Sequence, residues 1–214
     1  MELIWSNLGA FFVGAGVTLR ISLTSVCFGL IIGLVFGLMR ISKNRIIRFL
    51  AGIYVEVIRG TPLLVQLLYI YYALPQVGII VPKYVAATIA ISINSGAYVA
   101  EIVRAGIQSI DKGQMEAARS LGMSYPAAMR YIILPQAFRR IIPPLVNEFI
   151  TLIKDSSLIS VLGIAELTRV AEQIMSRTFN VFVPFTATAV IYFIMTFTLS
   201  QLMAYLERRW QIRD

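Results

Sequence analysis

Amide, hydroxyl and carboxylate side chains recur at helical spacing within otherwise apolar stretches of the sequence. Asn94, Tyr98 and Glu101 stand at positions i, i+4 and i+7, so a helix would place all three on one face. Glu101 also precedes Arg104 by three residues, and the two could form an ion pair. These side chains can hydrogen-bond to a polar solute, and Asn94 is the better candidate ligand.

A second polar face follows later in the chain, where Glu148, Thr151 and Asp155 fall at i, i+3 and i+7. Glu148 has no basic neighbour at helical spacing in its own apolar stretch. A buried carboxylate without a partner is costly unless it is protonated, so a cationic ligand could supply the missing charge. An ion pair with Arg20 or Arg59 from another helix is the alternative.

A third polar group combines charge with a helix-bending residue. Glu56 and Arg59 are three residues apart and could pair, and Pro62 should kink the helix just beyond them. The group is either a hinge or gate, or a self-satisfied ion pair near the membrane interface.

Covalent catalysis and metal binding are poorly supported by the residue types present. The chain has no histidine and a single cysteine, Cys27, so the commonest general base and metal ligand are missing. No Gly-Lys-Ser or Gly-Lys-Thr run offers a phosphate-binding loop. We therefore expect neither a catalytic residue nor a metal site, and an enzyme is the least favoured class.

The composition indicates a membrane protein. Of 214 residues, 58% are hydrophobic and 14% are charged, whereas a soluble domain keeps more charge on its wet surface. Several stretches reach the length of about 20 apolar residues that a helix needs to cross a bilayer. Glu2 stands where a cleaved signal would be basic, so the first segment should remain a transmembrane helix. The expected fold is all-α, with one transmembrane domain over residues 1–214.

The hydropathy pattern predicts about five transmembrane helices. Their expected ranges are 17–39, 49–74, 84–107, 141–162 and 184–206. Pro143 and Pro144 are expected to start the fourth helix, and Ser95-Gly96-Ala97 should let a neighbouring helix approach the third closely. Residues 164–177 predict a short amphipathic helix at the outer surface.

Basic residues gather on one side of this topology. Most of the 19 lysines and arginines lie between the first and second expected helices, between the third and fourth, and after the fifth. Cytoplasmic loops carry such an excess, so the N-terminus is expected outside and the C-terminus in the cytoplasm. The net charge of +8 therefore requires no nucleic acid partner.

The cytoplasmic segment at about 108–138 is too polar to cross a membrane. Residues 115–121 should form a short helix, which Gly122 ends with a positive φ. A second short helix should follow Ser124 and end before Pro135. The segment therefore predicts a helix–turn–helix knuckle, suited to docking in a groove of another protein.

The order Glu-Ala-Ala, Gly122 and Ile-x-Leu-Pro in this knuckle resembles the coupling-loop motif of permease subunits of bacterial ABC importers. Residues 55–75, 97–110 and 152–167 resemble the polar amino-acid permeases, the histidine, glutamine and arginine uptake group. The resemblance covers most of the chain, and it implies a structural or gating role for Asp155, in the run Lys154-Asp155-Ser156-Ser157. The residues it assigns to coupling with an ATPase are Glu116, Ala117, Ala118, Gly122, Leu134 and Pro135.

The resemblance implies a type I importer fold in the bacterial inner membrane. Two permease subunits, expected to be a homodimer, would form the pathway, and each knuckle would dock on a separate ATPase subunit. That ATPase would bind ATP and Mg²⁺, so this chain would need no cofactor. An extracytoplasmic binding protein would deliver the amino acid.

For an amino-acid solute, the polar faces predict a small cavity. Glu148 would hold a guanidinium or ammonium side chain, Asn94 and Thr151 would contact the rest of the zwitterion, and Leu67 and Tyr98 would shape the walls. A carboxylate where glutamine transporters are expected to carry an amide favours arginine, lysine or histidine. Glutamine or another polar amino acid is the alternative.

Two other functional classes stay open. An ion-coupled secondary transporter would suit the polar faces, and a non-transporting membrane scaffold would use them only to bind protein. The secondary transporter would leave the five helices and the cytoplasmic knuckle without a purpose, and the scaffold would bind no substrate. Uptake that follows an ion gradient and ignores ATP would favour the secondary transporter.

Overall fold

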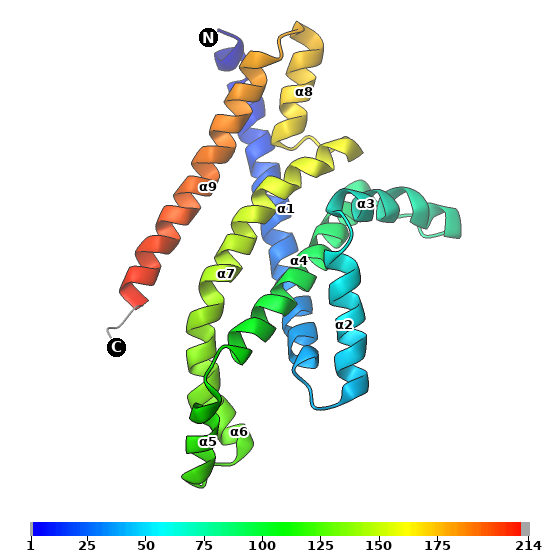
Figure 1. Cartoon of the computed structure of the whole chain (residues 1–214). Helices are drawn as coiled ribbons and strands as arrows, with labels where there is room; N and C mark the ends of the chain where they lie inside the picture. The colour runs from blue at the N-terminus through cyan, green and yellow to red at the C-terminus, as the bar shows by residue number, and fades with distance from the viewer. Residues whose placement is uncertain (1, 211–214) are drawn as a thin grey trace.

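The computed structural model describes residues 2–210, and their backbone forms helices, turns and loops without a strand. Figure 1 shows the helices running between two ends of an elongated molecule, with α8 near one end and α5 and α6 at the other. The elements in chain order are α1 (Glu2–Arg40), α2 (Arg45–Arg59), α3 (Leu63–Leu68), η1 (Tyr69–Ala73, π-helical), η2 (Leu74–Val77, 3₁₀), α4 (Lys83–Gln108), α5 (Lys112–Ser120), α6 (Tyr125–Ala128), η3 (Met129–Ile133, π-helical), α7 (Leu134–Asp155), η4 (Ser156–Leu162, 3₁₀), α8 (Leu167–Thr178) and α9 (Phe182–Trp210).

Helices α1 and α4 form the closest contact of the fold, because small residues face each other along both. A Cβ atom added to Gly33 would lie 2.4 Å from Cβ of Val99, and one added to Gly96 would lie 2.6 Å from Cγ2 of Ile32. The expectation that Ser95-Gly96-Ala97 allows close approach is therefore confirmed. The matching stripe on α1, in which Gly33 stands midway between Gly29 and Gly37, is a spacing typical of packed transmembrane helices.

The second apolar stretch is broken rather than kinked. The expectation of one helix over 49–74 is wrong, because α2 and α3 meet at an angle of 99° across a break. Pro62 has no N–H to continue the helical hydrogen bonds and disfavours helical backbone at the residue before it. In Figure 1, α3 runs away from the end of α2.

The fourth expected helix begins earlier than the sequence suggests. Helix α7 starts at Leu134, and Pro143 and Pro144 lie inside it instead of starting it. Pro135 occupies the first turn of α7, where a missing N–H is tolerated. The expectation that Pro135 ends the second knuckle helix is therefore also wrong, since the π-helical turn η3 carries the chain from α6 into α7.

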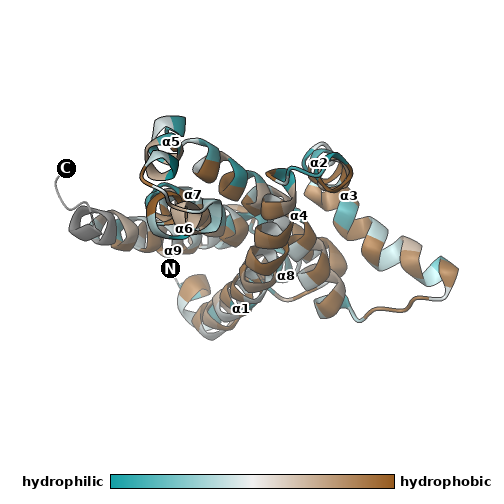
Figure 2. Cartoon of the chain, turned by 90° about the horizontal axis from the view of Figure 1, so that it is seen from below, coloured by the Kyte–Doolittle hydropathy of each residue, from teal (hydrophilic) through white to brown (hydrophobic). Residues whose placement is uncertain are grey.

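Three helices are long and apolar enough to cross a membrane by length and composition: Glu2–Arg40, Lys83–Gln108 and Phe182–Tyr205. The bent pair α2 and α3, with the turns that follow, is a fourth if it counts as one span. Large apolar side chains such as Phe12, Phe28 and Phe193 are exposed. Figure 2 shows mainly brown, hydrophobic residues on α1 and teal, hydrophilic residues on much of α5.

Helix α8 agrees with the expectation of a short amphipathic helix over residues 164–177. Helix α8 is amphipathic, and Val170, Ala171 and Ile174 are buried on its inner face. The Glu166 carboxylate caps its N-terminus by accepting hydrogen bonds from the backbone N–H of Thr168 at 2.8 Å and of Arg169 at 2.7 Å.

Candidate substrate cavity and coupling knuckle

A polar cavity of about 490 Å³ lies where α4 and α7 meet the break between α2 and α3. Residues 59–63 line it from the break, Asn94 and Tyr98 line it from α4, and α7 contributes three more. Those three are Glu148, Thr151 and Asp155, the face predicted from their spacing. The two sequence-predicted faces are therefore brought together, and the broken helix supplies the third wall.

Two larger grooves have a different character. One, of about 810 Å³, runs between α1 and α4, and the other, of about 720 Å³, runs between α1 and α9. Their walls are mostly apolar side chains such as Ile21, Phe28 and Phe11. Grooves of this kind along exposed apolar helices suit lipid acyl chains, so the polar cavity is the better candidate for a hydrophilic solute.

Glu148 is half-buried in the cavity wall, and no ion pair to it occurs within residues 2–205. The alternative of a pair with Arg20 or Arg59 is therefore not found. Arg20 lines the groove between α1 and α4 instead. The Arg59 guanidinium lies 5.2 Å from the centre of the Tyr98 ring, in a cation–π contact. The cavity thus contains two carboxylates and one guanidinium without an ion pair among them.

Asn94 is buried and connects the cavity to the broken helix. Its Nδ2 donates a hydrogen bond of 3.1 Å to Oε1 of Gln66, on α3. Gln66 is a functional candidate that the sequence reasoning missed. The available signal was a lone amide in an apolar stretch, four residues after a helix-breaking proline.

Two predicted cavity residues lie elsewhere. Leu67 is 1% exposed and packs in the apolar core with Ile91 and Leu152, so it supports the wall from behind. Glu101 lies outside the cavity lining, where Nε of Arg104 donates a hydrogen bond of 2.9 Å to its carboxylate.

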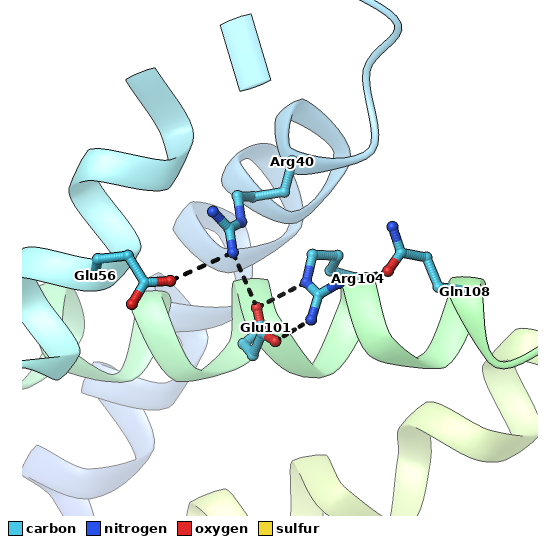
Figure 3. A network of polar contacts seen from close by, with 5 residues as sticks. All are labelled: Arg40, Glu56, Glu101, Arg104 and Gln108. Atoms are coloured by element: carbon cyan, nitrogen blue, oxygen red, sulfur yellow. Dashed lines mark hydrogen bonds and ion pairs between the residues drawn. The ribbon is translucent and has the colours of Figure 1, made fainter. Parts of the chain in front are cut away.

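Figure 3 shows that Glu101 belongs to a network of five polar residues. Arg40, the last residue of α1, lies 3.5 Å from the Glu56 carboxylate and 3.7 Å from that of Glu101. The expected Glu56–Arg59 pair is therefore wrong. Arg40 instead ties α1 to both α2 and α4, and Arg104 extends the network to Gln108.

The knuckle at about 108–138 has the predicted turn. Gly122 has φ +84°, and it follows α5, which carries Glu116, Ala117 and Ala118. Ala118 is buried and Glu116 and Ala117 are exposed. Leu121, at the tip, is 85% exposed. An exposed leucine on a short, well-capped helix pair is an available contact for a partner groove.

The knuckle is fixed to α7 by an apolar cluster. Its buried members include Ile110, Ile133 and Ala137, and Met115 packs against the cluster. Leu134 and Pro135 form the start of α7 itself. The predicted coupling residues therefore lie either on the knuckle or at the base of the helix that carries Glu148.

A family model and similar sequences of known proteins agree on the family to which this chain is similar. The model for binding-protein-dependent transport system inner membrane components matches residues 27–212. The chain is 44% identical to the glutamine transport system permease protein GlnP of Escherichia coli (strain K12) over 98% of this chain and 96% of that one. It is 42% identical to the arginine transport system permease protein ArtQ of Bacillus subtilis (strain 168) over 94% and 92%.

Solved structures agree on the fold. A crystal structure of an amino acid ABC transporter with histidines superposes with a TM-score of 0.93, at 50% identity and 96% coverage of both chains. A MetNI methionine ABC transporter in an inward-facing conformation superposes with a TM-score of 0.79, over 94% of this chain and 96% of that one. At 20% identity, this second likeness concerns the fold alone.

Proposed function

The chain belongs to the family of binding-protein-dependent transport system inner membrane components, and from that premise we propose that it imports cationic amino acids. It is an inner-membrane permease subunit of a polar amino-acid ABC importer with the type I fold. The finer assignment, to arginine, lysine or histidine, depends on the chemistry of the cavity. Relatives are named for both glutamine and arginine, so family membership does not choose between them.

The observation that carries the proposal is the unpaired Glu148 carboxylate in the cavity wall. A carboxylate removed from water is stabilised by a positive partner, and Arg59, the guanidinium that lines the same cavity, forms no ion pair with Glu148. A guanidinium or ammonium side chain would neutralise Glu148 during passage. A neutral glutamine side chain would leave the charge uncompensated, so the cavity should disfavour glutamine.

The remaining cavity residues suit the zwitterionic part of an amino acid. Arg59 is the cation available to the α-carboxylate, while Asn94 and Thr151 can hydrogen-bond to the rest of the backbone of the ligand. Asp155 lies at the end of α7 and lines the cavity together with Pro62 at the break. We assign Asp155 a gating role. Pro62 itself shapes the third wall.

The importer is proposed to work with three kinds of partner. The knuckle with Glu116 and Gly122 would dock on an ATPase subunit, which would bind ATP and Mg²⁺. A second copy of this chain would complete the pathway, and an extracytoplasmic binding protein would deliver the ligand. About five membrane crossings with the N-terminus outside fit the gathering of basic residues around the knuckle and the α1–α2 loop.

Uptake into proteoliposomes tests the substrate assignment. The vesicles would contain this chain with its ATPase and binding protein, and labelled arginine and glutamine would be compared in the wild type and in Glu148→Gln. We expect the wild type to prefer arginine and the variant to lose that preference by about tenfold or more, because an ionic partner is lost. Glu172→Gln, outside the cavity on α8, is the matched control.

Two results would contradict the proposal. Equal arginine preference in the wild type and in Glu148→Gln would make Glu148 a structural residue and leave selectivity outside this cavity. Uptake driven by an ion gradient without ATP would instead favour a secondary transporter, the alternative class.

A further inference from the structure

Pro62 leaves a backbone carbonyl at the end of α2 without its usual donor. In a continuous helix the N–H of residue 62 would donate to the carbonyl oxygen of Ile58, but proline has no N–H. The side chain of Gln66 supplies a closer donor, because its Nε2 lies 2.8 Å from that oxygen, whereas the backbone N and the Oγ1 of Thr61 each lie 3.4 Å from it. The same nitrogen lies 3.1 Å from the carbonyl oxygen of Thr61 and 2.7 Å from its Oγ1.

These contacts determine the orientation of the Gln66 side-chain amide, that is, which side its nitrogen and its oxygen face. Carbonyl oxygens only accept hydrogen bonds, so the NH₂ group and not Oε1 must face Ile58 and Thr61. Oε1 is therefore turned toward α4, where Nδ2 of Asn94 donates to it at 3.1 Å. The reverse orientation would place Oε1 against two acceptors, which is unfavourable in a half-buried position.

The orientation of Gln66 in turn orients Asn94. One N–H of Asn94 is used on Gln66, and within the described part of the chain no hydrogen bond reaches its Oδ1. Asn94 is 5% exposed and lines the cavity. The acceptor Oδ1 is thus left for a ligand. An acceptor in a poorly hydrated wall favours an N–H donor and disfavours a carboxylate, which has only acceptors.

We propose that Gln66 is a positioning residue that holds the Asn94 amide with its oxygen toward the cavity, making this wall selective for the α-ammonium group of an amino acid. The inference rests on the proposed function and deepens it: Asn94 takes the α-ammonium group, Glu148 the cationic side chain and Arg59 the α-carboxylate. Gln66 does not line the cavity and acts through Asn94.

A pair of ligands that differ only in the α-ammonium group isolates this effect. Labelled arginine and desamino-arginine would be bound at equilibrium to the purified permease–ATPase complex in nanodiscs, without the binding protein. The measured quantity is the ratio of the two affinities. Gln66→Met keeps the length of the side chain and removes its hydrogen bonds, and Gln76→Met, at an exposed glutamine outside the cavity, is the control.

We expect Gln66→Met to lower the affinity ratio by about tenfold, since a hydrogen bond to a charged group is weakened. The affinity for desamino-arginine should hardly change, because that ligand lacks the group in question. Asn94→Leu should lower the ratio at least as much. In this ratio the double variant should equal Asn94→Leu alone, because Gln66 influences the α-ammonium group only through Asn94. Gln66→Leu serves as a second variant if Gln66→Met does not assemble.

Three outcomes would count against the inference. An equal loss of affinity for both ligands in Gln66→Met would mean that Gln66 only supports the break in the helix. Additive effects in the double variant would mean that it acts independently of Asn94. A wild type that binds arginine but does not discriminate against desamino-arginine would overturn this inference alone, whereas a wild type that binds neither would overturn the proposed cavity as well.

Discussion

Glu101 and Glu148 are both carboxylates on long helices, yet their surroundings differ. Glu101 lies between Arg40 and Arg104, each within ion-pair distance, and is part of a network that ties three helices together. Glu148 faces a cavity in which Arg59 is engaged with an aromatic ring. At the scale of single residues, the first carboxylate is suited to holding helices together and the second to binding a ligand.

This difference predicts the behaviour of Glu101→Gln. Removing the charge leaves Arg40 and Arg104 partly unpaired, so the complex should lose about 1–3 kcal/mol of stability. Thermal unfolding of the purified complex would show a lower Tm, while the preference for arginine over glutamine in uptake should persist. Glu172→Gln, whose pair with Arg169 is more exposed, should cost at most about 1 kcal/mol.

A different result for Glu101→Gln would support the sequence-based prediction that Glu101 contacts the amino acid. If Glu101→Gln left the Tm unchanged and abolished the arginine preference, Glu101 would be a ligand of the amino acid. The helical spacing of Glu101 to Asn94 would then predict the role of Glu101 better than its ion pairs do.

At the scale of elements, the fold depends on close contact between α1 and α4. Gly33 has no room for a side chain, since an added Cβ would lie 2.4 Å from Val99. Gly16, on the same helix, has no heavy atom within 4 Å of the added Cβ. The two positions therefore form a matched pair in which helix propensity is the same and only the packing differs.

Gly33→Ala should separate α1 from α4 and destabilise the protein by about 1–3 kcal/mol. Gly16→Ala should be neutral or slightly stabilising, because alanine is the better helix former. Yield and Tm of the purified protein in detergent would measure both effects. Equal tolerance of the two substitutions would mean that α1 and α4 are not packed as closely as described.

The elements also show how far the sequence alone can lead. The range of α4 follows directly from its apolar stretch, and the polar faces of α4 and α7 were recognised from spacing. The break at Pro62 was underestimated, because the sequence does not reveal that Gln66 can cap the freed carbonyl and stabilise a bend of 99°. The start of α7 was misplaced because Pro143 and Pro144 are tolerated inside the helix.

Contacts between distant segments were the least predictable part of the site. Pairing of Glu56 with Arg59 was expected from their spacing, but Arg40 lies closer to Glu56 once α1 and α2 fold back on each other. The sequence places Leu67 in the cavity wall, whereas its side chain packs in the apolar core. The direction of that side chain depends on the break between α2 and α3, which the sequence does not show. Both errors arise from tertiary packing, which local spacing does not encode.

At the scale of the whole molecule, one helix connects the knuckle to the cavity. Helix α7 begins with Leu134 and Pro135 beside the knuckle and carries Glu148 and Asp155 near its other end. Its 22 residues span about 33 Å at the usual rise of 1.5 Å per residue. Figure 1 shows α7 running from the end of the molecule that holds α5 and α6 toward the opposite end. A displacement of the knuckle by a partner ATPase would therefore be transmitted to the cavity wall through a continuous helix.

Protection of an introduced cysteine tests whether an amino acid occupies the cavity beside Glu148. In a Cys27→Ser background, the purified complex carrying Thr151→Cys would be treated with a thiol reagent, with and without arginine. Thr88→Cys, in the apolar groove between α1 and α4, is the control. Arginine should slow modification at position 151 only, and Glu148→Gln should abolish this protection. Unchanged modification at position 151 in saturating arginine, under conditions that support uptake, would contradict occupancy of this cavity by the amino acid.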